Sequence, residues 1–198
     1  MKKQLAVLLM LVSSSASAIT TNYFGNFSND DNVLLTTFDV DVTSIVHFES
    51  FAYAGGTMSD GTVVADGGFD SQLHLFDLNM NLIRSDDDGA SRVSASSGNS
   101  WDSMFDYTLD AGSYIIALTQ YNNDWMGGSW SGAGVTGFMD VSGSQRNSSY
   151  AFEISGTALV NVDGNVIEPP ISAVPVPAAV WLFGSGLIGL AGVARRKK

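Results

Sequence analysis

The stretch FDVDVTSIVHFES, residues 38–50, carries the clearest two-residue alternation in the chain. Its apolar residues fall on one side of an extended chain: Phe38, Val40, Val42, Val46 and Phe48. Its polar residues fall on the other side: Asp39, Asp41, Thr43, His47 and Glu49. Because successive side chains of a strand point to opposite faces, the pattern predicts one half-buried strand, or two strands joined by a bend near Thr43 and Ser44.

Shorter segments of the same kind lie on both sides of this stretch, separated by turns rich in Gly, Asp, Asn and Ser. We expect an edge strand within 19–31, a short strand at 62–65 inside a Gly-rich loop, a hairpin over 69–84 that turns at Asp77–Asn81, a strand at 104–109, a central strand at 113–121 and a last strand at 150–154. No helical periodicity occurs between residues 19 and 165. This organisation predicts an all-β fold, an antiparallel, jelly-roll-like β-sandwich over residues 19–165.

The charges are separated along the chain. Six of the nine Lys and Arg residues lie at the two ends, which leaves three arginines in the middle against all 20 Asp and Glu residues. So acidic a body excludes nucleic-acid binding, which needs clustered cations, and favours solubility or the uptake of divalent cations. The chain has no cysteine, which excludes disulfides and thiolate chemistry.

The first 18 residues have the pattern of a secretory signal peptide. Lys2 and Lys3 form the charged start, residues 5–12 the apolar run, and Ala16–Ala18 the small-residue cleavage pattern. We therefore predict export, with cleavage after Ala18.

The other end of the chain has the composition of a membrane helix. Residues 166–175 form a linker and a Pro-containing motif, and residues 176–198 an apolar segment that ends on Arg195, Arg196, Lys197 and Lys198. The 19 residues 176–194 span about 28 Å as a helix, which matches a bilayer core. The terminal cations favour the cytoplasmic side, so the body of the chain is expected across the membrane.

This tail resembles the PEP-CTERM sorting signal of Gram-negative bacteria. The resemblance is carried by PAAVWLFGSGLIGL, residues 177–190, and by the basic end, while Val174, Pro175, Val176 and Pro177 stand where the family often has Pro-Glu-Pro. It implies transient residence in the inner membrane, processing by an exosortase-type enzyme, delivery to the cell surface or extracellular matrix, and a link to exopolysaccharide and biofilm. The alternative is an ordinary membrane anchor.

Residues 69–124 resemble the bacterial pre-peptidase C-terminal type of β-sandwich. The resemblance rests on FDSQLHLFDLNMNLIRSDDDG followed by DSMFDYTLDAGSYIIALTQYNN, with Met80 where the family's turn often has Gly. Members of that group are non-catalytic accessory modules, and some of them bind calcium or polymers.

The loop Asp86-Asp87-Asp88-Gly89 is a candidate metal site. In an extended chain Asp86 and Asp88 point to one side, and Asp102 with backbone carbonyls would complete a cage of oxygens. Calcium suits such oxygens better than zinc. The alternative is a solvated acidic turn whose Asp side chains cap backbone amides.

A long loop over residues 122–149 is a second candidate binding region. Trp125 and Trp130 lie beside Asn122 and Asn123, and such aromatic and amide groups stack on sugar rings and hydrogen-bond to their hydroxyls. The alternative is that the two tryptophans fold back and cap one end of the sandwich.

No sequence pattern indicates catalysis. His47 and His74 are the only imidazoles, and each is expected to be exposed on the polar face of its strand. No serine lies in a G-x-S-x-G elbow, and Glu occurs only at positions 49, 153 and 168. We therefore expect a non-enzymatic surface or matrix protein, with a calcium- or carbohydrate-binding module as the alternative.

Overall fold

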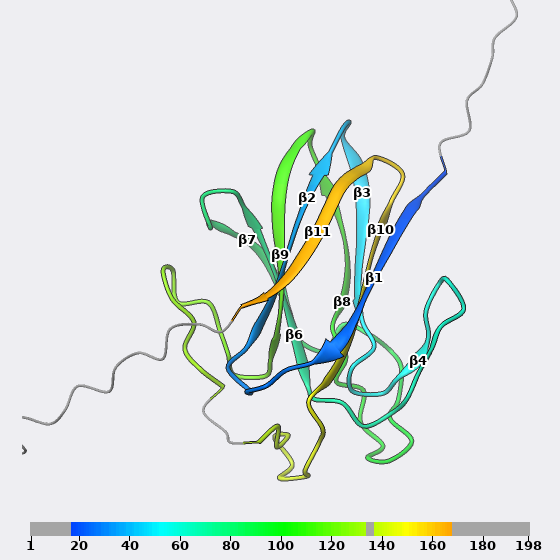
Figure 1. Cartoon of the computed structure of the whole chain (residues 1–198), viewed down its shortest axis with the longest axis vertical. Coiled ribbons are helices and arrows are strands. Elements are labelled where there is room, and N and C mark those ends of the chain that lie inside the picture. Colours follow the sequence, from blue (N-terminus) through cyan, green and yellow to red (C-terminus); the bar gives the residue numbers. More distant parts are fainter. Residues whose placement is uncertain (1–16, 134–136, 168–198) are drawn as a thin grey trace, which may run out of the picture. The chain divides into compact units, whose positions relative to one another are not determined.

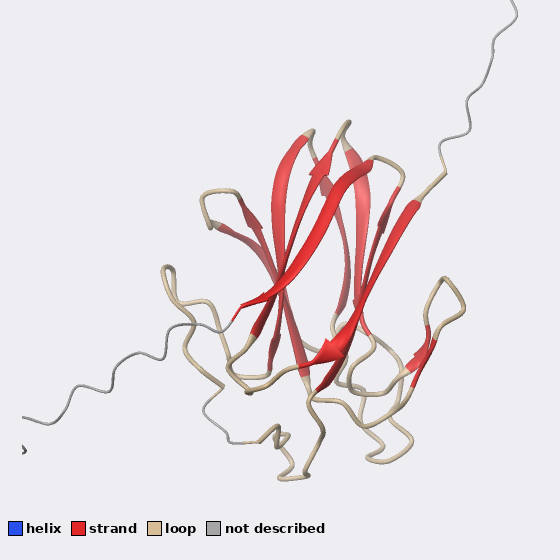
Figure 2. Ribbon diagram, in the orientation of Figure 1, coloured by secondary structure: helices blue, strands red, loops and turns tan. Residues whose placement is uncertain are grey.

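A computed structural model describes residues 17–133 and 137–167. These residues form two antiparallel β-sheets and a small hairpin, and they contain no helix (Figure 2). The all-β antiparallel prediction is therefore confirmed, and the two facing sheets make it a sandwich (Figure 1).

One sheet has four strands, in the order β1-β10-β3-β8. Their bounds are Ile19–Asn26 for β1, Ser149–Gly156 for β10, Ser44–Ser50 for β3 and Met104–Leu109 for β8. The expected edge position of the first strand is confirmed, since β1 pairs only with β10.

The second sheet has five strands, in the order β11-β2-β9-β6-β7. Their bounds are Leu159–Ile167 for β11, Val33–Val40 for β2, Gly112–Gln120 for β9, Ser71–Asp77 for β6 and Leu82–Asp86 for β7. Strand β9 is central, as its apolar character on both faces predicts. The small hairpin pairs β4 (Gly56–Thr57) with β5 (Val63–Val64).

The stretch at residues 38–50 divides between the two sheets. Its first half ends β2 and its second half forms β3, so the bend near Thr43 moves the chain from one layer to the other. Phe38 and Phe48 then meet across the core, with their ring centroids 5.6 Å apart. Val42 lies in the connection and is 63% exposed, contrary to the expected shared face, because the alternation stops where the strand ends.

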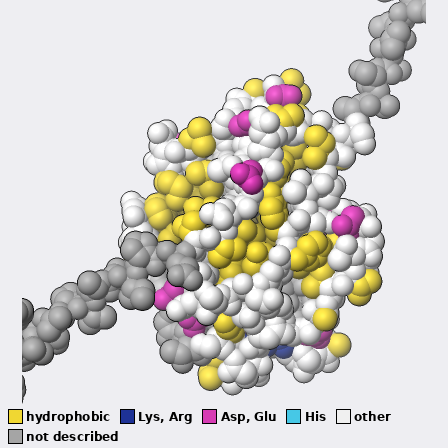
Figure 3. All heavy atoms as spheres, in the orientation of Figure 1, with side chains coloured by type: hydrophobic (Ala, Val, Ile, Leu, Met, Phe, Trp, Pro, Cys, Tyr) yellow, Lys and Arg dark blue, Asp and Glu magenta, His cyan; other side chains and the backbone are white. Residues whose placement is uncertain are grey.

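The edge strands β1 and β11 lie near each other on one side of the sandwich. Tyr23 from β1 packs against the core together with Val162 and Val166 from β11. Gly164 leaves room for the tyrosine ring, since a Cβ there would come within 2.5 Å of it. Hydrophobic side chains gather over this face, with acidic groups scattered around them (Figure 3).

Two of the three arginines in the described residues turn inward. Arg146 is 7% exposed and stacks over Tyr53 at 3.9 Å while it donates to the Tyr53 carbonyl at 2.7 Å and to Asp66 at 3.1 Å. Arg92 lies 3.9 Å over the Phe51 ring and pairs with Glu49. These guanidinium groups stabilise loops at the ends of the strands and add little positive charge to the surface.

The ends of the chain lie beyond the described residues. Strand β11 continues to Ile167, two residues into the segment expected as a linker. The described part of the chain contains no helix long and apolar enough to cross a membrane. The predicted signal-peptide residues 1–16 and the predicted membrane helix at 176–198 fall outside that part.

Candidate cation site and adjoining groove

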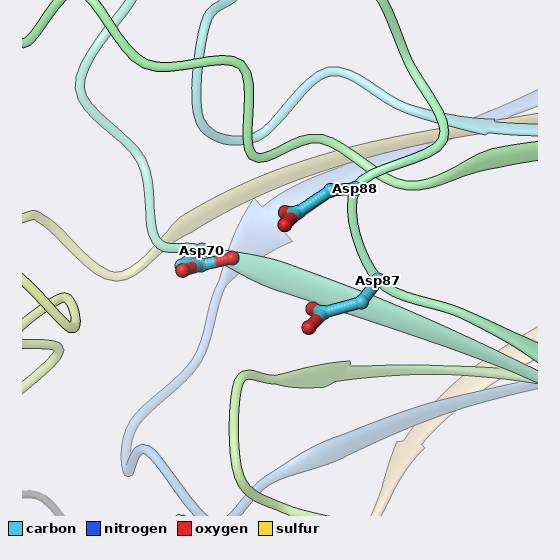
Figure 4. Close-up of side chains that lie close together, drawn as sticks. All are labelled: Asp70, Asp87 and Asp88. Atoms are coloured by element: carbon cyan, nitrogen blue, oxygen red, sulfur yellow. The ribbon is translucent and has the colours of Figure 1, made fainter.

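Three carboxylates converge at one end of the β6–β7 hairpin. Asp70 directly precedes β6, and Asp87 and Asp88 directly follow β7. One oxygen from each lies within 4.8 Å of the others, and Figure 4 shows the three side chains pointing into a shared space. The antiparallel pairing places Leu73 opposite Asp86, so the chain before β6 and the chain after β7 meet at the same end of the sheet.

These carboxylates have few partners of their own. Asp70 is 3% exposed, and its Oδ1, like the Oδ1 of Asp87, is buried without a hydrogen-bond partner. Burial, then repulsion from Asp87 and Asp88, raises the pKa of Asp70 to about 8. Burial and neighbouring carboxylates, Asp88 first, raise the pKa of Asp87 to about 6. A buried negative charge of this kind is stable only with a proton or a cation beside it.

Asp86, expected as a ligand, instead holds the loop backbone. Its Oδ2 accepts hydrogen bonds of 2.9 Å from the N–H groups of Gly89 and Met104. The chain passes so close that a Cβ at Gly89 would lie 2.1 Å from the Met104 carbonyl oxygen. The capping role considered for the acidic turn therefore holds for Asp86, while Asp87 and Asp88 turn toward Asp70.

Asp102, the third expected ligand, is a structural residue outside the converging group. Its carboxylate is fully buried and accepts hydrogen bonds from the N–H groups of Tyr53 and Ala54, each 2.9 Å long, and from Ser50 Oγ at 2.8 Å. Arg92 lies 3.7 Å away. These donors fix the chain after β3 to the start of β8.

A groove of about 370 Å³ adjoins the three carboxylates on the outer face of the five-stranded sheet. Its lining residues are Gln72, His74, Leu82, Ser85, Asp86, Asp87, Asp124 and Trp125. Asp87 belongs both to this lining and to the converging group. The lining contains no Lys or Arg.

His74 is buried, which corrects the expectation of an exposed imidazole. It is 3% exposed, and its ring nitrogens lie 3.1 Å from Ser85 Oγ and 3.3 Å from Thr119 Oγ1. Burial lowers its pKa to about 4. The outer face of β6 is covered by Trp130, which meets the imidazole edge-on.

His47 lies on the other sheet, half-buried in an ionic cluster. Its Nδ1 is 2.7 Å from Asp106 and its Nε2 is 3.2 Å from Glu49. The hydrogen bond with Glu49, and secondarily that with Asp106, raises its pKa to about 9 against the opposing effect of burial. His47 is therefore charged and paired near neutral pH.

The two tryptophans of the long loop fold back on the body of the protein. Trp125 and Trp130 form an isolated β-bridge and pack edge-on against Phe76, 5.4 and 6.1 Å from its ring centroid. They cover the outer face of the five-stranded sheet, not one end of the sandwich as the alternative supposed. Trp125 nevertheless lines the groove.

The two asparagines predicted with them lie apart from the groove lining. Asn123 is fully buried, donates to the Asp31 carbonyl at 3.0 Å and accepts from the Gly132 N–H at 3.0 Å. Asn122 is exposed in a left-handed turn with φ of 68°.

Asp70 is the site residue that the sequence reasoning missed. A signal for it exists, because a hairpin that turns at Asp77–Asn81 places residue 70 opposite residues 88 and 89. With that strand register and the acidic run at 86–88, the sequence predicts that Asp70 lies close to Asp88.

Comparison with known proteins identifies the tail. Residues 173–198 match the model of the PEP-CTERM protein-sorting motif, which includes Val174, Pro175, Val176 and Pro177. No curated protein matches the chain. Among solved structures, the pre-peptidase C-terminal domain of a collagenase from Bacillus anthracis is similar with a TM-score of 0.37 and 11% identity, over 70% of this chain and 89% of that one. The motif marks an exported protein of a Gram-negative bacterium that an exosortase-type enzyme recognises and processes at the membrane.

Proposed function

We propose that this protein is a non-enzymatic component of the cell surface or extracellular matrix, associated with exopolysaccharide, whose β-sandwich binds calcium at Asp70, Asp87 and Asp88. The observation that carries the cation site is the buried Asp70 carboxylate, whose Oδ1 has no hydrogen-bond partner and which converges with the carboxylates of Asp87 and Asp88. The sorting motif supports the cellular setting.

The donor set favours calcium among the divalent cations. The three converging side chains offer only hard carboxylate oxygens, and calcium binds six to eight such ligands in flexible geometry. Zinc prefers nitrogen and sulfur, but the chain has no cysteine and both histidines have other partners. Bound calcium would balance the repulsion among the three carboxylates and fasten the β7–β8 loop to the start of β6.

The surroundings of the histidines support a role without catalysis. The ring nitrogens of His74 and His47 already lie at hydrogen-bond distance from partners within the fold. His74 contacts Ser85, but its other ring nitrogen contacts Thr119, whereas a serine–histidine–carboxylate triad has a carboxylate at that position. Both ring nitrogens of His47 contact carboxylates.

Thermal unfolding of the full-length chain in detergent, with chelator or with millimolar calcium, tests the cation site. We expect calcium to raise Tm in the wild type and not in Asp70→Asn, which keeps the shape of the side chain and removes its charge. Asp41→Asn, in the exposed β2–β3 connection, is the matched control and should respond as the wild type does. Equal Tm values with chelator and calcium in the wild type would refute the site.

The cellular part of the proposal has a separate test. Cells with and without the exosortase-type enzyme are fractionated, and the C-terminus of the mature protein is measured by mass spectrometry. We expect the protein in the matrix fraction without its intact tail, and in the membrane fraction when the enzyme is absent. Retention of residues 173–198 on matrix protein would contradict processing.

A further inference from the structure

The groove beside the cation site is rich in hydrogen-bond acceptors, and neither Lys nor Arg lines it. Gln72 is 91% buried and lines the groove, and its Oε1 has no hydrogen-bond partner. Asp87 also lines the groove, and its Oδ1 has no hydrogen-bond partner either. Asp86 and Asp124 add two further carboxylates. Buried acceptors without donors are costly, so a ligand that brings N–H or O–H groups is favoured here.

The charge of the groove excludes anionic ligands. No Lys or Arg lines it, and the imidazole of His74 is neutral near pH 7 because burial lowers its pKa to about 4. A carboxylate or phosphate would meet only like charges. A positively charged donor such as an ammonium group would meet carboxylates at several positions.

One wall of the groove is aromatic and held in place. Trp125 packs edge-on against Phe76 and lies 5.2 Å from Trp130, which fixes the orientation of its indole. An aromatic ring beside carboxylates attracts organic cations and the apolar faces of sugar rings. The groove therefore joins a surface for stacking to a surface for ammonium recognition.

We propose that this groove binds an amino sugar, a hexosamine unit whose free ammonium group pairs with Asp87 and Asp124 while its ring lies against Trp125. This proposal names a ligand class within the exopolysaccharide association proposed above and rests on it. A lysine side chain would satisfy the carboxylates, but it has no hydroxyl groups for Gln72 and Ser85. A hexosamine supplies both the ammonium group and the hydroxyl groups, and a groove of about 370 Å³ is large enough for it.

The two sites are coupled because they share Asp87. Calcium at Asp70, Asp87 and Asp88 would neutralise a carboxylate on which the ammonium group depends. Calcium should therefore weaken amino-sugar binding, and the amino sugar should weaken calcium binding by the same factor.

Titration of the full-length chain with D-glucosamine, followed by tryptophan fluorescence in chelator, tests the proposal. The matched probes are D-glucose, which has a hydroxyl in place of the ammonium, N-acetyl-D-glucosamine, which has no charge, and Nα-acetyl-lysine amide, which has the ammonium without the ring. We expect saturable binding of glucosamine that is clearly tighter than that of each other probe. Equal binding of glucose or of the lysine derivative, or no response to glucosamine, would overturn it.

Two substitutions separate this proposal from the calcium site. Asp124→Asn lies on the exposed rim and should weaken glucosamine binding about threefold to fivefold while the calcium-induced rise in Tm persists. Asp70→Asn should remove the response to calcium and preserve glucosamine binding. If Asp124→Asn binds glucosamine as the wild type does, the groove assignment is wrong; if calcium alone has no effect, only the cation site is wrong.

Discussion

The indole of Trp130 lies edge-on to the imidazole of His74, with their ring centroids 5.4 Å apart and their planes at 66°. Trp130 comes from the long loop between β9 and β10, and His74 from the middle of β6. Trp130 packs on a polar position of β6 that is buried, and burial lowers the pKa of His74 to about 4 despite the attraction of Asp124.

Trp130→Ala should therefore raise the pKa of His74 toward its ordinary value of 6.5. In the wild type, the neutral form contributes stability that is fully present above pH 6.5 and is lost as the pH falls through about 4, since the unfolded chain binds the proton more readily. Histidine NMR titration measures the pKa. Trp101→Ala, which removes an indole packed on Tyr53, is the control and should leave the His74 pKa unchanged.

His47 should show the opposite dependence on pH. Its pKa is raised to about 9, so its ion pairs contribute stability that is fully present below pH 6.5 and is lost as the pH rises through about 9. Glu49→Gln should lower the His47 pKa more than Asp106→Asn, because the hydrogen bond with Glu49 is the largest cause of the shift. In the same NMR titration, a midpoint near pH 6.5 for wild-type His47 would contradict its raised pKa, and the same midpoint for His74 would contradict its lowered pKa.

Asp102→Ala should destabilise the fold strongly. The substitution leaves the N–H groups of Tyr53 and Ala54 without their acceptor and removes a charge near Arg92. We expect a loss of about 3 kcal/mol in the free energy of unfolding, measured with urea. Asp41→Ala, at an exposed position, should change it by less than about 0.5 kcal/mol.

Gly89→Ala should cost about 1–3 kcal/mol in the free energy of unfolding, because its methyl group would overlap the Met104 carbonyl oxygen. Gly128→Ala is a matched control, since no atom lies within 4 Å of a Cβ at that position. It should leave stability unchanged or raise it slightly. Equal effects of the two substitutions would show that the β7–β8 loop moves away without cost.

The fold was predictable because strand alternation is a local property. Phe38 and Phe48 alternate with polar residues in a way that only half-buried strands explain, and the acidic turn at Asp77 marks a hairpin without any tertiary information. The burial of the outer face of β6 under the β9–β10 loop was not predictable in this way. Gln72 and His74 have the pattern of a solvent face, but the loop that carries Trp130 begins more than 45 residues later in the chain.

The acidic site was predicted in part. The run from Asp86 to Asp88 marks the region, but alternation assigns Asp86 and Asp88 to one side only while the chain stays extended. The strand ends at Asp86, whose carboxylate accepts a hydrogen bond from the loop backbone at Gly89. The side chains of the next two residues, Asp87 and Asp88, converge with Asp70. Which carboxylates converge thus depends on where a strand stops, a property that local pattern determines poorly.

Because two arginines face inward, the surface charge of this protein should affect how closely many copies can pack together. With Arg92 and Arg146 directed into the fold, the described surface is a polyanion that must hold its own atmosphere of small counter-ions. At physiological ionic strength, repulsion between neighbouring copies extends over about 8 Å. A dense layer of such molecules would take up water and swell by osmotic pressure, and multivalent cations would contract it.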